Sequence, residues 1–193
     1  MSNSRTNGPA RKCSATDSLL LVVDIQQRLG DAMPGKVLNR VLLNTKLLAA
    51  ASSLLGIPVI KTEQYPTGLG PTHALVAAEL PATTVALEKV CFSCCDGDGF
   101  SAALTASGRR QVILVGMEAH VCILQTALDL AAAGHEVYVV EDAICSRRLE
   151  NYQNALDRLR QSGIVVVSAE SVVFEWMGSA GHEHFKAIHA LLR

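Results

Sequence analysis

Three reactive side chains follow apolar, β-branched runs of this sequence. Asp24 follows LLLVV, Lys89 follows TTVALE, and Cys122 lies shortly after QVILV, in the segment GMEAHVC. A carboxylate can take and return a proton, an ammonium can hold negative charge in place, and a thiol can attack a carbonyl carbon. Together these groups predict acyl transfer to a thiol, which becomes hydrolysis when water receives the acyl group.

Each of these residues also has an ordinary structural explanation. An aspartate often closes a strand, a lysine stem can lie along an apolar surface, and a buried cysteine packs as a small apolar side chain. What favours a functional interpretation is that an acid, a base and a thiol come at equivalent ends of three different runs. We therefore interpret Asp24, Lys89 and Cys122 as a catalytic set.

Cys122 stands at the start of a predicted helix over residues 122–133. Unpaired amides and the helix dipole favour an anion there, so we expect a thiolate whose pKa Lys89 lowers further. Asp24 would accept a proton, pass it to a leaving amine, or activate water. The same backbone amides would surround an attacked carbonyl and form an oxyanion hole.

The elements that must position these groups alternate along the chain. Apolar runs predict strands, and the stretches between them show helical spacing. The strands are expected at residues 19–24, 58–62, 83–89, 111–117, 136–142 and 164–168, and clear helices at 37–55, 122–133 and 152–161. Runs such as VILV lack polar alternation, which indicates a parallel sheet covered on both faces. We predict a three-layer α/β/α sandwich with a six-stranded, mostly parallel, Rossmann-like sheet, whose ligands bind beyond the carboxyl ends of the strands.

Length and composition fit one domain over residues 18–193 after a flexible, polar N-terminal tail at residues 1–17. The chain has 193 residues, of which 49% are hydrophobic, and its 17 basic and 18 acidic residues leave a net charge of −1. Nothing supplies the clustered positive charge that nucleic acid requires, and no apolar stretch approaches the roughly 20 residues needed to span a bilayer. Six cysteines without a secretory signal favour a reduced, cytoplasmic setting; a mitochondrial transit peptide in the tail is the alternative.

Over roughly residues 18–193 the sequence resembles the isochorismatase-like cysteine hydrolases. The segments that carry the resemblance are LLLVVDIQQRL (19–29), EQYPTGLGPT (63–72), EKVCFSC (88–94), VILVGMEAHVCILQTALDL (112–130) and EVYVVEDAICSR (136–147). The resemblance implies a catalytic triad at Asp24, Lys89 and Cys122. It also implies a non-proline cis peptide at Met117–Glu118 and oxyanion donors at the Glu118 and Cys122 amides. The sequences of these segments are most similar to uncharacterised isochorismatase-domain hydrolases of bacteria and eukaryotes, so the resemblance does not identify a substrate.

Two departures from other branches narrow the expected reaction. Nicotinamidases place Asp and His metal ligands after the second strand, where this chain has KTEQYP, so we expect no metal and no cofactor. True isochorismatases cleave a vinyl ether and need no thiol, so Cys122 favours a small amide, imide or carbamoyl substrate and a thioester intermediate. The alternatives are vinyl-ether hydrolysis and a non-catalytic interaction module. A nuclease has less support, because phosphodiester cleavage needs a metal-binding acid cluster or paired histidines.

Three further residues are expected to line the pocket for a small-molecule substrate. Gln64 and Tyr65 follow the second predicted strand, and His120 precedes Cys122 by two positions. His120 could also serve as a base, although a Cys–His pair normally comes from separate elements. Cys91 and Cys94 have redox-motif spacing, but their apolar surroundings favour a structural role.

Two apolar segments predict a homo-oligomer. The helix at residues 122–133 is apolar on nearly every side, and SVVFEWMG at 171–178 follows the last strand. We expect that one monomer cannot bury both, and that Trp176 lies where subunits meet, because aromatic residues and methionine are enriched at interfaces.

Overall fold

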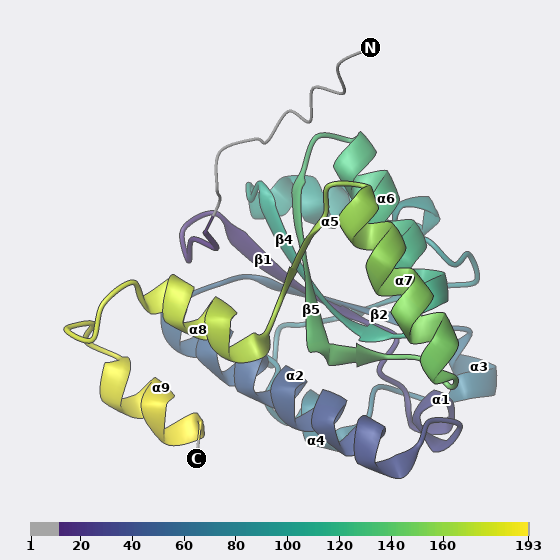
Figure 1. Ribbon diagram of the computed structural model, residues 1–193, viewed down its shortest axis with the longest axis horizontal. Helices are drawn as coiled ribbons and strands as arrows, with labels where there is room; N and C mark the ends of the chain where they lie inside the picture. The colour runs from purple at the N-terminus through teal and green to yellow at the C-terminus, as the bar shows by residue number, and fades with distance from the viewer. Residues whose placement is uncertain (1–11, 193) are drawn as a thin grey trace.

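The central strands of this protein are buried along their length because helices cover both faces of the sheet they form. In the computed structural model, which describes residues 12–192, a six-stranded sheet has the order β3-β2-β1-β4-β5-β6, and every neighbouring pair is parallel (Figure 1). The strands are β1 (Ser18–Val23), β2 (Val59–Gln64), β3 (Ala86–Lys89), β4 (Gln111–Met117), β5 (Glu136–Cys145) and β6 (Val165–Val167). The predicted three-layer α/β/α sandwich is confirmed, with a sheet that is parallel throughout.

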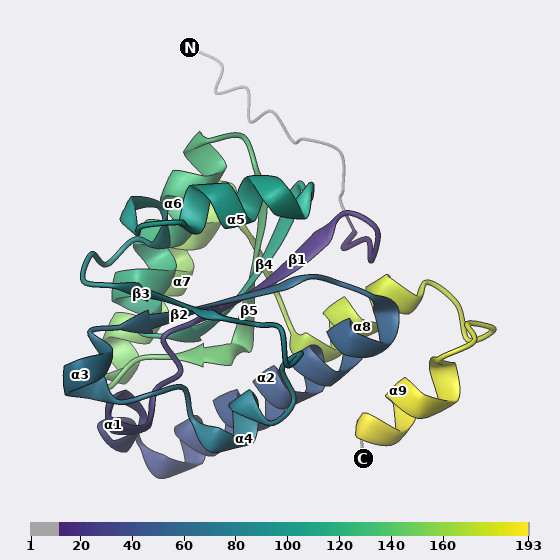
Figure 2. The same cartoon turned by 180° about the vertical axis from the view of Figure 1, so that it is seen from behind.

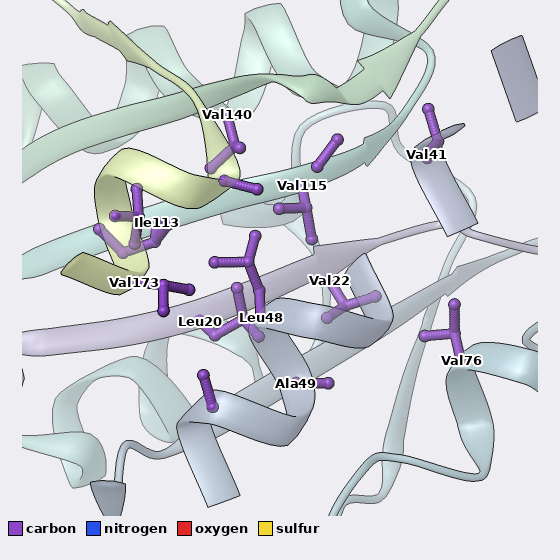
Figure 3. Packing of buried hydrophobic residues seen from close by; sticks show 14 of the residues in the cluster. Leu20, Val22, Val41, Leu48, Ala49, Val76, Ile113, Val115, Val140 and Val173 are labelled. Atoms are coloured by element: carbon purple, nitrogen blue, oxygen red, sulfur yellow. The ribbon is translucent and has the colours of Figure 1, made fainter. Parts of the chain in front are cut away.

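Alternate residues of the central strands serve two separate cores. In β1, Leu20 and Val22 point to one face, while Leu19, Leu21 and Val23 point to the other. Figure 3 shows the first of these cores, in which side chains of β1 and β4 pack against Leu48 of one helix and Val173 of another. Because both faces are buried, β1 and β4 contain no exposed position.

The helices divide between the two faces (Figures 1 and 2). One face carries α2 (Gly35–Leu55), α4 (Ala74–Ala77), α8 (Ala169–Met177) and α9 (Phe185–Leu191); the other carries α5 (Phe100–Ser107), α6 (Leu124–Ala132) and α7 (Leu149–Gln161). The short α1 (Gln27–Asp31), α3 (Pro66–Leu69), the 3₁₀ turn η1 (Cys94–Asp96) and the π-helical turn η2 (Ala119–Ile123) complete the described chain. Within residues 12–192, no helix combines the length and apolar character that crossing a membrane requires.

Most predicted elements are present with shifted ends. Strand β3 starts at Ala86, three residues later than expected, and β5 continues to Cys145. The helix expected to start at Cys122 begins earlier, because the π-helical turn η2 runs directly into α6. Cys122 therefore lies within the first turn of a longer helical segment.

Gly116 allows β1 and β4 to approach closely beside Asp24. It pairs with Val23, its φ is +127°, and a Cβ there would lie 1.9 Å from the Val23 carbonyl oxygen. We expect Gly116→Ala to lower the free energy of unfolding by about 2–3 kcal/mol in urea titrations, because backbone must move. Gly163→Ala is the matched control: Gly163 also has positive φ, at +79°, but nothing within 4 Å of its Cβ position. If the two variants lose equal stability, the close contact is not what requires glycine at position 116.

The predicted N-terminal tail is described only in part. Its first eleven residues lie outside the described range. From residue 12 on, the chain packs against the domain: the Cys13 amide donates to Glu175 Oε2 at 2.7 Å, and the Ser14 amide donates to Gln111 Oε1 at 2.7 Å. Cys13 itself is buried.

The expectation that Trp176 lies where subunits meet is wrong. Trp176 is 4% exposed within the single chain, and its indole Nε1 donates to Ser18 Oγ at 2.9 Å. It is buried because α8 packs against α2 and β5. In α6, Leu124 and Leu130 face the sheet, while Gln125 is exposed. Phe174 of the same segment is 40% exposed, but Trp176 itself is buried within the monomer.

Candidate active site

The three predicted catalytic residues meet at the point where the strand order reverses. Chain connections run from β1 outward to β2 and β3, then return to β4 on the other side of β1. Such a switch point opens a crevice at the carboxyl ends of the strands. Asp24 directly follows β1, Lys89 is the last residue of β3, and Cys122 lies in η2 after β4. All three are buried.

Lys89 links the other two side chains. Its Nζ donates to Asp24 Oδ2 at 2.7 Å and lies 3.7 Å from Cys122 Sγ. The remaining acceptors around this ammonium are Gln64 Oε1 at 2.7 Å and the carbonyls of Cys91 and Phe92, each at 3.3 Å. The ammonium is therefore held in one place, with its charge next to both the carboxylate and the sulfur.

The pKa of Cys122 contradicts the expected thiolate. Burial raises this pKa to about 12, the Asp24 charge and a hydrogen bond to Asp24 raise it too, and Lys89 lowers it only in part. Burial alone would lower the pKa of Lys89, but the Asp24 carboxylate and the Cys122 sulfur reverse this, so the net pKa is above its ordinary value. At neutral pH the resting site thus holds a thiol and an ammonium beside Asp24. The helix terminus does not outweigh burial.

Thr62 is a site residue that the sequence analysis missed. Its Oγ1 donates to Asp24 Oδ1 at 2.7 Å, and the Asp24 amide donates back to the Thr62 carbonyl at 3.2 Å. Asp24 itself has a left-handed backbone, with φ +51°. The available signal was the position of Thr62 two residues before Gln64, since alternate residues of a strand share a face.

Gln64 is at the site but does not face open space. Its Oε1 accepts from Lys89, and its Nε2 donates to the Val90 carbonyl at 2.8 Å. The buried Gln26 holds the Gln64 backbone from both sides: Gln26 Oε1 accepts from the Gln64 amide at 2.7 Å, and Gln26 Nε2 donates to the Gln64 carbonyl at 3.0 Å. Gln64 thus supports Lys89, and Gln26 is a second residue that the sequence analysis missed.

A cleft of about 480 Å³ opens beside Lys89. Tyr65, one of the predicted pocket residues, lines it. The other lining residues come from the start of α3, the end of β3 and the 96–98 turn: Pro66, Thr67, Glu88, Val90, Cys91, Asp96, Gly97 and Asp98. The cleft therefore carries three carboxylates against the single ammonium of Lys89, which already pairs with Asp24.

His120 lies apart from this cleft. Its Nδ1 is 2.9 Å from Ser146 Oγ, and its Nε2 is 3.3 Å from Asn151 Nδ2. Both ring nitrogens are thus occupied by polar side chains at the end of β5 and in α7. His120 and Tyr65 therefore do not line the same cleft.

The turn that carries Cys122 begins with a cis peptide bond between Met117 and Glu118, as the resemblance implied. The amides of Val121 and Ile123 donate to the Glu118 carbonyl at 3.1 and 3.3 Å. The Glu118 carboxylate points elsewhere, because its Oε2 accepts from the Arg147 amide at 2.9 Å and from Arg147 Nε at 3.1 Å.

The side chains at the end of β2 do not resemble a metal site. Gln64 is at this position, and its side-chain amide accepts a hydrogen bond from Lys89 and donates one to the Val90 carbonyl. Within residues 12–192, no three His, Cys, Asp or Glu side chains come together in a way that would hold a metal ion.

Sequence comparison finds one family over most of the chain. The family described as Isochorismatase domain matches residues 18–171. Isochorismatase domain-containing protein 1 of Salmo salar is 37% identical over 170 residues, which cover 88% of this chain but only 59% of that relative. Isochorismatase domain-containing protein 2 of Danio rerio is 38% identical over 183 residues, covering 94% of this chain and 89% of that one.

Solved structures with the same fold include proteins with different descriptions. A Caenorhabditis elegans protein described as MAR1 ribonuclease has a TM-score of 0.87 and 34% identity, covering 94% of this chain and 92% of its own. YcaC from Pseudomonas aeruginosa, solved with covalent acrylamide, has a TM-score of 0.85 and 23% identity, with 94% and 91% covered. Escherichia coli YcaC, described as an octameric hydrolase of unknown specificity, has a TM-score of 0.82 and 24% identity, with 96% of each chain covered.

Proposed function

Because this chain belongs to the isochorismatase family of hydrolases, we propose that it hydrolyses a C–N bond of a small amide, imide or carbamoyl compound through a thioester on Cys122. The observation that carries the proposal is the position of the Lys89 ammonium, 2.7 Å from Asp24 Oδ2 and 3.7 Å from Cys122 Sγ. This arrangement supports the proposal, because it brings a carboxylate, a thiol and a fixed positive charge together in one buried site.

In the first half of the proposed reaction, Asp24 takes the proton of the Cys122 thiol as the sulfur attacks the carbonyl carbon. The raised pKa of Cys122 makes this transfer necessary, since a free thiolate would be scarce at neutral pH. Lys89 stabilises the charge that forms on sulfur, and the Glu118 and Cys122 amides would hold the carbonyl oxygen. The C–N bond then breaks, and Asp24 returns the proton to the leaving nitrogen.

In the second half, water attacks the thioester carbonyl while Asp24 accepts a proton from that water. The C–S bond breaks, and the proton on Asp24 returns to the Cys122 sulfur. The products are the amine or ammonia and a carboxylic acid, and the site recovers its starting protonation. Throughout, Lys89 stays protonated, in agreement with its raised pKa.

The direct test is to trap the thioester. A panel of small amides, imides and carbamoyl compounds is screened for release of ammonia or amine, and reactions of the active compounds are acid-quenched within one turnover. Peptide mass spectrometry should find the acyl mass on Cys122. Turnover without any adduct on Cys122, in a burst experiment that would detect it, contradicts the proposal.

The same screen separates the alternatives. Cleavage of a vinyl ether without an adduct would support the isochorismatase-type reaction, and a complete lack of turnover together with an inert Cys122 would support an interaction module. RNA is included because a relative is described as a ribonuclease. The carboxylates of Glu88, Asp96 and Asp98 line the cleft and disfavour a phosphodiester backbone, so we expect RNA to stay intact.

We also propose that the chain forms a homo-oligomer, in the manner of the octameric YcaC of Escherichia coli. The support in this chain lies around the edge strand β3, where Val85 is 77% and Phe92 is 54% exposed. Exposed apolar side chains grouped at a sheet edge are typical of a contact surface.

We expect sedimentation equilibrium to give a multiple of 20.5 kDa, and Val85→Asp with Phe92→Asp to reduce that mass by burying charge in the contact. Leu149→Asp is the control, since Leu149 is also exposed but belongs to α7, which packs against β6, the edge strand at the other end of the sheet from β3. A concentration-independent mass of 20.5 kDa for the unaltered protein would reject the oligomer. Loss of mass only in the Leu149 variant would move the interface to α7.

A further inference from the structure

We propose that Thr62 is the positioning residue that orients Asp24 as a base, an inference that rests on the function proposed above. Asp24 must receive a proton from sulfur and release it to nitrogen, so the direction of its carboxylate matters. Thr62 touches neither the thiol nor the cleft, so any effect it has passes through Asp24.

Each carboxylate oxygen of Asp24 accepts a hydrogen bond from a different side chain. Lys89 Nζ donates to Oδ2, and Thr62 Oγ1 donates to Oδ1, both at 2.7 Å. A contact on one oxygen alone leaves the carboxylate plane free to turn about that contact. A second donor on the other oxygen fixes the plane.

The Thr62 hydroxyl has little choice of acceptor. Thr62 is 2% exposed, and among residues 12–192 its Oγ1 has one side-chain partner besides Asp24, Cys94 Sγ at 3.8 Å, which is a weak acceptor. Cys94 is itself fixed, because its amide donates to Thr126 Oγ1 at 2.9 Å. The β-branched Thr62 side chain in a strand also has restricted χ1 freedom. The hydroxyl proton therefore points at Asp24.

A donor aimed at Oδ1 holds the Asp24 carboxylate in one orientation. Without it, the carboxylate would turn more easily and would meet the Cys122 thiol less often in a geometry that allows proton transfer. Loss of the Thr62 hydroxyl therefore slows the transfer of the proton from Cys122 to its acceptor.

The test uses acrylamide as a probe of Cys122 and needs no substrate. The sulfur adds to the β-carbon of acrylamide, and the thiol proton passes through Asp24 to the α-carbon. Peptide mass spectrometry of the unaltered protein and of each variant gives the rate at which acrylamide modifies Cys122 from pH 5 to 9. We expect Thr62→Val, which is isosteric, to lower the rate about tenfold to a hundredfold. Thr62→Ser keeps the hydroxyl and should stay within about threefold of the unaltered protein.

The matched control is Thr45→Val. Thr45 is also a buried threonine, on α2, and its Oγ1 has no hydrogen-bond partner among the described residues. The same change there should leave the acrylamide rate and its pH profile unaltered. Circular dichroism and thermal unfolding show whether each variant is folded.

The possible outcomes separate failure of the role proposed for Thr62 from failure of the proposed function. If Thr62→Val matches the unaltered protein in rate and profile while Asp24→Asn loses the reaction, the role of Thr62 is overturned and the proposed function stands. Equal losses in Thr62→Ser and Thr62→Val indicate packing and also overturn it. If Asp24→Asn leaves the Cys122 rate unchanged, the proposed function fails, whatever Thr62 does.

Discussion

Replacing Cys122 with alanine is expected to lower the turnover of any C–N substrate by about four orders of magnitude or more. The alternative nucleophile, water, would have to attack an unactivated carbonyl with only Asp24 to assist it. Amine or ammonia release under saturating substrate measures the loss in kcat. Binding of substrate should persist, because the walls of the cleft, formed by the start of α3, the end of β3 and the 96–98 turn, are unchanged.

Two companion variants make this result specific. Cys122→Ser replaces the thiol with a less acidic hydroxyl and should lose nearly as much activity. Cys95→Ala changes a half-buried cysteine in η1 that contacts none of the three catalytic candidates, so it should keep full activity. If Cys122→Ala keeps its turnover, the thioester mechanism is contradicted and vinyl-ether hydrolysis is favoured instead.

Breaking the Asp24–Lys89 pair is expected to cost both stability and activity. Each side chain is buried, and their bond is 2.7 Å long. Removal of one partner leaves the other without compensation, so Asp24→Asn and Lys89→Met should each lower the free energy of unfolding by about 3–5 kcal/mol. Each should also lower kcat by orders of magnitude, since one removes the base and the other removes the charge beside the sulfur.

The double variant separates the two effects. Asp24→Asn combined with Lys89→Met leaves neither charge of the pair, so chemical denaturation should show much of the lost stability regained. Activity should stay as low as in the worse single variant. The surface pair Lys46–Glu79, with a 3.1 Å contact, is the control, because an exposed pair contributes only about 0–1 kcal/mol. A double variant no more stable than the single ones would mean that the pair is not the main reason for the destabilisation.

The fold and the three catalytic candidates could be predicted because their signals are local. A buried strand in a parallel sheet must be apolar on both faces, and runs such as VILV in β4 show this directly. In such a sheet the carboxyl ends of the strands share one edge, so the sequence alone was enough to place Asp24, Lys89 and Cys122 together.

The contacts that support Asp24 and Lys89 are decided by the register of neighbouring strands, which the spacing of residues in the sequence does not reveal. The pairing of Val23 with Thr62 brings the Thr62 hydroxyl to Asp24, and the pairing of Gln64 with Lys89 brings the amide oxygen to the ammonium. A shift of one residue would turn both side chains to the other face of the sheet. Thr62 and Gln26 therefore could not be recognised from residue type, and Gln64 was placed in the pocket although it holds Lys89.

Burial is the other property that only the tertiary structure decided. The sequence places Cys122 near a helix start, which favours a thiolate, but packing between β4, η2 and the helices around it removes water and raises the pKa to about 12. In the same way, the apolar composition of 171–178 is compatible with an interface, but the position of α8 over α2 buries Trp176 inside the monomer. Residue types along the chain determine which groups are available for chemistry. The solvent that each group loses depends on neighbours that are distant in sequence, and this loss determines its charge and its role.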